Sequence, residues 1–120
     1  MTKAEFPWRF RAKPIRAIDG DTIEVLVDHG FRHFSTQRIR LKDINCHEVN
    51  SPFPELREAA FQAKAATERW LNNVDKSVEW PLTIYTGKLS FDRWVGLVVD
   101  SNGHDLGDHL VINGYAVVNS

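Results

Sequence analysis

Side chains that could bind a cation or a phosphate gather in three short segments of the 120-residue chain. The first is DGDT, residues 19–22, where two carboxylates flank a glycine directly before an alternating apolar stretch. The second is RIRLKDINCHE, residues 38–48, and the third is KLSFDRW, residues 88–94. Each segment taken singly is typical of a β-turn or a solvated strand end. Their combination is the part of the sequence that points to chemistry.

Together the three segments contain the groups needed to hydrolyse a phosphodiester. Hard cations such as Ca²⁺ bind carboxylate, amide and backbone oxygens, so Asp21 and Asn45 can supply two side-chain ligands. Glu48 can orient or deprotonate a water molecule held by such a cation. Arg40 and Arg93 can bind a phosphodiester through paired hydrogen bonds and offset the charge that builds on its oxygens. We expect this chemistry only if the fold brings the five residues together.

Hydropathy patterns predict the elements that must position these groups. The strands are expected at residues 8–18, 22–27, 36–44, 78–86 and 93–99, the helices at 54–73 and 105–113, and a final extended piece at 115–118. Three strands, a helix and two further strands are the order of a five-stranded Greek-key barrel of the OB type. The sequence therefore predicts an α+β, mainly β, OB-fold barrel with two to three helices.

Composition favours one soluble globular domain over residues 1–120, with residues 1–7 as a flexible N-terminal arm. The formal net charge of −1 excludes a chain that is basic throughout, although the first sixteen residues carry an excess of lysine and arginine. With a single cysteine the chain forms no internal disulfide. No signal peptide or membrane span is visible, which favours a cytoplasmic monomer, or a secreted protein if a signal has been removed.

Four segments resemble the staphylococcal-nuclease-like (thermonuclease) domain family, and the resemblance runs from about Ile15 to Val118. AIDGDTIEV, residues 17–25, looks like the opening motif of the family, and RLKDINCHE, residues 40–48, looks like its arginine–strand–aspartate–x–proline–glutamate motif. EAAFQAKAATERWL, residues 58–71, is similar to the first helix of the family. LVINGYAVV, residues 110–118, is similar to its late helix and closing glycine segment.

The resemblance implies an OB barrel that holds Ca²⁺, or Mg²⁺ or Mn²⁺ instead, and cleaves DNA and RNA with little sequence specificity. Asp21 and Asn45 fall on metal-ligand positions, and Asp19 falls on a neighbouring acid. Cys46 falls where a backbone carbonyl reaches the metal. Glu48 falls on the general-base position of the family.

Two arginines fall on phosphate-binding positions of the family. Arg40 matches the first, and Arg93 matches the second when Asp92 is aligned with the family glycine and Gly96 with a small strand residue. Departures from the pattern are Asn45 in place of an aspartate, His47 in place of a proline, and Asp92 in place of that glycine.

The expected partner is single-stranded or frayed DNA or RNA, with no membrane involved. Trp94 and Phe91 are candidates to stack on bases, although core packing is the alternative for each. Two other functions stay open. One is a catalytically weakened or inactive domain that binds single-stranded nucleic acid, and the other is a barrel used only for protein interaction.

Overall fold

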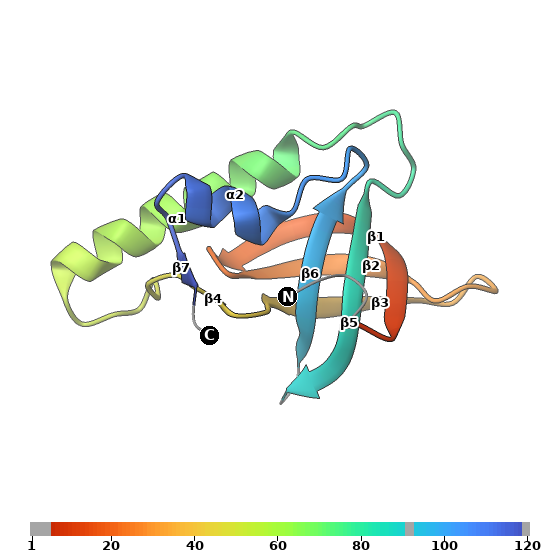
Figure 1. Cartoon of the computed structure of the whole chain (residues 1–120), viewed down its shortest axis with the longest axis horizontal. Helices are drawn as coiled ribbons and strands as arrows, with labels where there is room; N and C mark the ends of the chain where they lie inside the picture. Colours follow the sequence, from red (N-terminus) through yellow and green to blue (C-terminus); the bar gives the residue numbers. More distant parts are fainter. Residues whose placement is uncertain (1–5, 91–92, 119–120) are drawn as a thin grey trace.

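Five strands close into a barrel in the order β1–β2–β3–β6–β5, as Figure 1 shows for the computed structural model, which describes residues 6–90 and 93–118. The barrel strands are β1 (Trp8–Asp19), β2 (Thr22–Asp28), β3 (Phe34–Leu41), β5 (Leu82–Ser90) and β6 (Arg93–Asp100). All neighbouring pairs are antiparallel except β3 and β6, which run parallel and complete the closure. The predicted five-stranded, OB-like, mainly β barrel is confirmed.

Strand alternation fills the barrel. Ile23, Val25 and Val27 of β2 are fully buried, and the residues between them are partly exposed. On β3, Ile39 and Leu41 are buried in the same way. Because β-strand side chains alternate between faces, the other residues of each strand point outward and are free for the surface.

Two helices pack on one side of the barrel in the described part of the chain, namely α1 (Pro54–Asn72) and α2 (Leu106–Ile112). Pro54 occupies the first turn of α1, where its missing N–H is not needed. The Asp105 side chain caps α2 by accepting the N–H of Asp108 at 3.2 Å. Gly114 follows α2 with a φ of 79°, which confirms its predicted role in ending the helix.

Three predicted boundaries were wrong. The strand predicted at 36–44 is divided, because Asp43 has a φ of 58° and turns the chain between β3 and the short β4 (Ile44–Asn45). The strand predicted at 78–86 lies at Leu82–Ser90, after a bend over residues 78–80. The closing segment pairs only through β7 (Val117–Val118), which is antiparallel to β4.

The predicted arm, residues 1–7, lies outside the described residues except for Phe6 and Pro7. Pro7 lies against Gly87 of β5, where a Cβ atom would come within 2.4 Å of the proline ring.

No helix in the described ranges combines the length and apolar composition required to cross a membrane.

Candidate functional site

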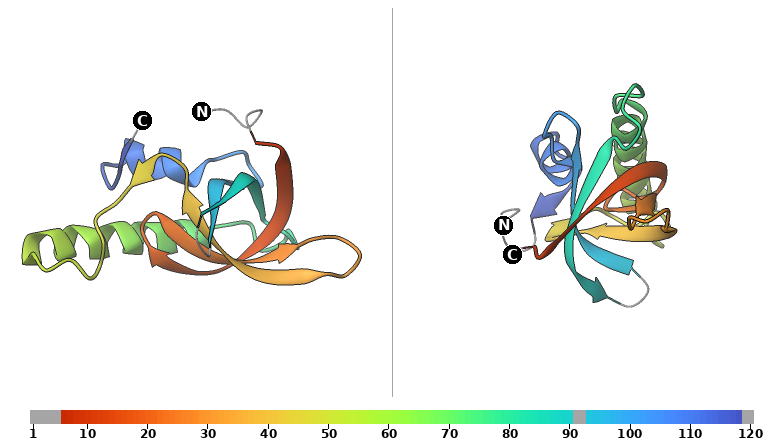
Figure 2. Two further views of the ribbon diagram at one scale, coloured as in Figure 1. Left: turned by 90° about the horizontal axis from the view of Figure 1, so that it is seen from below. Right: turned by 90° about the vertical axis from the view of Figure 1, so that its right-hand side faces the viewer.

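The candidate site lies where the β1–β2 turn, the end of β3, β4 and helix α1 meet. Figure 2 shows this end of the barrel beside α1, with the β2–β3 hairpin extending to the opposite end. Asp19 and Asp21 come from the turn, Arg40 from β3 and Asn45 from β4. Residues separated by up to 26 positions in sequence therefore converge on one end of the fold.

Helix α1 fixes the position of the β1–β2 turn. Gly20 lies so close to the helix that a Cβ atom would be 2.8 Å from the Ala63 Cβ and 2.8 Å from the Cys46 Sγ. The buried Thr67 hydroxyl donates a hydrogen bond of 2.6 Å to the Gly20 carbonyl. Small residues on this face of α1 allow the close approach, and the hydrogen bond satisfies a carbonyl that water cannot reach.

The Asp21 carboxylate is buried and held on several sides. One oxygen accepts the backbone N–H of Cys46 at 2.9 Å, and the other accepts the Thr22 hydroxyl at 3.2 Å. The Arg40 guanidinium lies 3.5 Å from the same oxygen that Cys46 contacts. The side chain of Asp21 is therefore fixed in one orientation, facing the end of β3 and the start of the loop after β4.

The Arg40 guanidinium donates its hydrogen bonds to oxygens of residues that closely follow it in the sequence. One terminal nitrogen donates to the Leu41 carbonyl at 2.8 Å and also to the Ile44 carbonyl. The other donates to the Asn45 side-chain oxygen at 2.5 Å. The oxygens of Asp21 and Asn45 thus converge on one cationic group, although that group is the guanidinium of Arg40.

Asp19 lies in a cluster of like charges. Burial raises the pKa of its carboxyl above the ordinary value, and Asp21 and Glu48 raise that pKa further. A hydrogen bond of 3.4 Å from the Val49 N–H and the positive charge of Lys64 act in the opposite direction. Asp21 and Glu48 are therefore each close enough to Asp19 to repel its negative charge at this end of the barrel.

Lys64 of α1 was missed by the sequence analysis. It lowers the pKa of Asp19 through its charge, so it lies near that carboxylate. The helical period could have identified it, because Lys64 precedes the buried Thr67 by three residues and therefore shares its face of α1.

The Cys46 thiol is held in its neutral form. Burial and the negative charges of Asp21 and Asp19 raise its pKa to about 12, although Arg40 acts in the opposite direction. A thiol with this pKa is not a nucleophile near neutral pH. Its side chain instead packs against Gly20, and its backbone N–H holds Asp21.

The oxygen atoms at this site are of the kind that binds a hard cation such as Ca²⁺. Asp21 and Asn45 would supply the side-chain oxygens, the backbone carbonyl of Cys46 is the third expected ligand, and Asp19 adds negative charge nearby. No three His, Cys, Asp or Glu side chains lie close enough to share a metal ion among residues 6–90 and 93–118. Any such site would therefore depend on the amide of Asn45 and on backbone oxygens.

The remaining predicted residues lie at the edge of this group or away from it. Glu48 is exposed in the loop before α1 and near enough to Asp19 to raise the pKa of that carboxyl. Arg93 is half-buried at the start of β6. Arg40 pairs with Val95, which is two residues beyond Arg93, so the two arginines are offset by about 7 Å along the strands. Trp94 packs against Phe10 and the core, which is the alternative given for it above. Phe91 and Asp92 lie outside the described residues.

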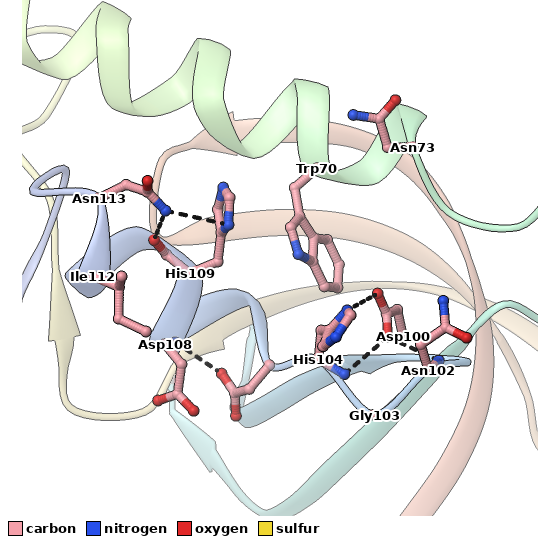
Figure 3. A pocket seen from close by; sticks show the side chains of 11 residues that line it. Trp70, Asn73, Asp100, Asn102, Gly103, His104, Asp108, His109, Ile112 and Asn113 are labelled. Atoms are coloured by element: carbon pink, nitrogen blue, oxygen red, sulfur yellow. Dashed lines mark hydrogen bonds and ion pairs between the residues drawn. The ribbon is translucent and has the colours of Figure 1, made fainter.

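A larger cavity, of about 620 Å³, lies between the end of α1, the turn after β6, and α2 (Figure 3). Its polar groups are largely engaged in the fold: Asp100 accepts the backbone N–H groups of Asn102 and His104 and lies 3.4 Å from the His104 ring. It contains none of the residues predicted from sequence. A smaller cavity, of about 300 Å³, adjoins the candidate site at Asn45 and Cys46.

Neither a family model nor a curated protein sequence matches this chain. The staphylococcal-nuclease-like assignment thus stays a prediction that depends on the four motifs. The closed five-stranded barrel, in contrast, is observed in the structure.

Proposed function

We propose that the protein is a cation-dependent nuclease, similar to the staphylococcal-nuclease-like family, that hydrolyses phosphodiester bonds of single-stranded or frayed DNA or RNA. The observation that carries the proposal is the convergence of Asp21, Asn45 and Arg40 at the end of the barrel, with Asp19 and Glu48 near enough to repel each other. Such repulsion is unfavourable for folding, and a bound cation would relieve it.

Each side chain has one role in this proposal. Asp21, Asn45 and the Cys46 carbonyl hold the cation, with Ca²⁺ the first choice and Mg²⁺ or Mn²⁺ the alternatives. When bound, the cation polarises the phosphodiester and lowers the pKa of its water. Glu48, exposed at the edge of the site, accepts a proton from the attacking water.

Arg40 and Arg93 bind the phosphate oxygens in the proposal. The Leu41 and Ile44 carbonyls hold one terminal nitrogen of Arg40, which reduces the entropy lost when the guanidinium meets a phosphate. A phosphate would compete for the other terminal nitrogen, which now contacts Asn45 and Asp21.

The test is cleavage of a fluorescent single-stranded oligonucleotide with Ca²⁺, Mg²⁺, Mn²⁺ or a chelator. Glu48→Ala is expected to lower the rate by about 10²- to 10⁴-fold, the usual contribution of a general base. Glu68→Ala serves as the control, because it removes the same charge from an exposed position on α1.

Cleavage that survives chelation, or that falls equally in both variants, would contradict the proposal. Cleavage that depends on the cation and is lost only with Glu48 would support it. The preferred cation would then show how the neutral Asn45 affects selectivity.

A nucleic-acid-binding domain without activity is the second candidate, and the contacts of Arg40 favour it. Its guanidinium already bonds Asn45, and that amide carries no charge to attract a divalent cation. Salt-sensitive binding without cleavage under any cation would select this function.

A further inference from the structure

The outward face of β3 leads directly to the candidate site. Phe34, Thr36 and Arg38 are exposed, while Ile39 and Leu41 are buried, so the even-numbered side chains of this strand point away from the barrel. Arg40 is the last of the outward series and belongs to the candidate site. At about 3.3 Å per residue, the six steps from Phe34 to Arg40 span about 20 Å.

A pair of stacked rings lies at the far end of this face. Phe34 and Trp80 have ring centroids 5.7 Å apart and an interplanar angle of 12°. Phe34 remains 52% exposed and Trp80 is half-buried, so this ring pair, which we call the aromatic platform, is open to solvent on its Phe34 side. The Lys13 ammonium lies 4.6 Å from the centre of the Trp80 ring, and the Arg11 guanidinium lies 5.7 Å from it.

The charge on this face favours an anion although the chain has a net charge of −1. The outward acids of β2 are already paired with β1: Asp28 with Arg11 at 2.5 Å, and Glu24 with Arg16 at 3.1 Å.

Two cations of the face lack a carboxylate partner. Within the described ranges neither Lys13, whose ammonium lies over the Trp80 ring, nor Arg38 forms an ion pair. An excess of positive charge therefore lies between the aromatic platform and Arg40.

An exposed ring at one end of this face and cations without carboxylate partners beside it match the chemistry of an unpaired nucleic-acid strand. Bases stack on aromatic faces without regard to sequence, and phosphates bind arginine and lysine. A duplex offers no free base faces to the platform, because its bases are already stacked on each other. A face about 20 Å long also suits the short end of the usual range, about 4–16 nucleotides for each OB fold.

We propose that single-stranded DNA or RNA lies along the outward face of β3, with bases stacked on the Phe34–Trp80 platform and phosphates bound at Arg38. The course of the strand towards Arg40 rests on the proposed function, but the binding itself does not. The platform thus lies at the part of the bound strand farthest from the scissile bond.

The experiment measures binding of a fluorescent twelve-nucleotide single strand in the presence of chelator, where no cation-dependent cleavage occurs. Phe34→Ala is expected to weaken binding about tenfold, the size of one lost stacking partner. Arg38→Ala is expected to lower the slope of log affinity against log salt by about 0.7, the value for one phosphate contact on a single strand.

Matched variants on α1 provide the controls. Phe61 is 53% exposed, close to the 52% of Phe34, and Arg57 is exposed like Arg38. Phe61→Ala and Arg57→Ala are expected to bind within twofold of the wild type, and thermal melts of all four variants check that each one folds.

The outcomes separate this inference from the proposed function. Losses confined to Phe34→Ala and Arg38→Ala support it, even if the protein cleaves nothing. Equal affinities in the β3 and α1 variants, or no binding by the wild type, overturn it. If the protein does cleave, Phe34→Ala should slow cleavage of the twelve-mer but leave that of a dinucleotide unchanged, because a dinucleotide does not reach the platform.

Discussion

The two ends of the β2–β3 hairpin are destabilised in different ways: the candidate site by repulsion between carboxylates, and the hairpin tip by backbone strain. At the candidate site the backbone is well packed, with Gly20 against Ala63 and its carbonyl bonded to Thr67, but like charges gather there. At the hairpin tip the charges are solvated, but the backbone is strained. Phe31 and Arg32 have φ values of 54° and 61° in the turn closed by the hydrogen bond from His33 to Gly30.

The difference follows from what surrounds each end. Helix α1 covers the β1–β2 turn, so packing and hydrogen bonds can hold carboxylates that repel one another. No described residue covers the tip, where Phe31 is 97% exposed. Carboxylates that repel one another stay close only where the surrounding packing is rigid. Two residues in a strained conformation are held by the paired strands β2 and β3 alone.

The largest expected effect on stability comes from adding a side chain at Gly20, in the β1–β2 turn of the candidate site, which we call the packed end. Gly20→Ala places a Cβ atom 2.8 Å from both Ala63 and Cys46 and should lower the free energy of unfolding by about 1–3 kcal/mol. Gly30→Ala at the hairpin meets no atom within 4 Å, so only its φ of 85° opposes the change, at about 1 kcal/mol. Urea denaturation measures both. A smaller loss for Gly20→Ala than for Gly30→Ala would contradict the contrast between packing and strain.

The second prediction tests the charge of the packed end and depends on the proposed function. Asn45→Asp adds an anionic oxygen beside Asp21, so the Ca²⁺ concentration that gives half-maximal cleavage should fall about tenfold, since ligand charge tunes Ca²⁺ affinity. Asn50→Asp adds the same charge to the exposed loop nearby and should change this concentration much less. An equal change in both variants would indicate general attraction of the cation without a specific ligand.

The third prediction relieves the strain at the opposite end. Replacing Phe31 and Arg32 by Asn and Gly provides the residues that prefer two successive positive φ angles in a hairpin. The free energy of unfolding should rise by about 1 kcal/mol, at the lower end of the usual cost of one such residue. Thermal melts with unchanged circular dichroism measure this gain. A loss of stability would mean that Phe31 or Arg32 makes a contact that offsets its conformation.

Local signals were sufficient for most of the fold. Alternation located β1 and β2 within one residue at each end, and the alanine period located α1 with an error of one residue at its C-terminus. Local signals failed at Trp80, where residues 78–80 alternate like a strand but form a bend that brings the indole onto Phe34. That placement depends on a contact between segments 46 residues apart, which no local pattern records.

The sequence predicted which residues form the candidate site, but it did not predict the hydrogen bonds between them. Spacing and resemblance selected Asp21, Arg40 and Asn45, and the fold does bring these three together. No sequence pattern indicates that Arg40 itself bonds Asn45, or that the charge of Lys64 reaches Asp19, because both depend on the tertiary arrangement. The strain at Phe31 was also missed, since turn rules favour Asn and Gly at such positions.

The smallest effect is expected from pH, because Asp19 is partly solvated and water screens its repulsion. Burial, then Asp21 and Glu48, raise the pKa of Asp19 above its ordinary value of 3.8 in the folded protein. The folded state therefore holds this proton more tightly than the unfolded state, and the contribution of Asp19 to stability falls as pH rises from 3.8 through the raised pKa. Asp19→Asn should remove this loss, so the variant should melt above the wild type at pH 7 and gain less near pH 3.

Asp75 provides a control of opposite sign. The hydroxyl and backbone N–H of Ser77 lower the pKa of Asp75, so its ionised form stabilises the fold, and this contribution is lost as pH falls. Asp75→Asn should thus melt below the wild type at pH 7, while Asp19→Asn melts above it. If both variants shifted in the same direction, the melts would report loss of charge in general, and repulsion at the packed end would not be the cause.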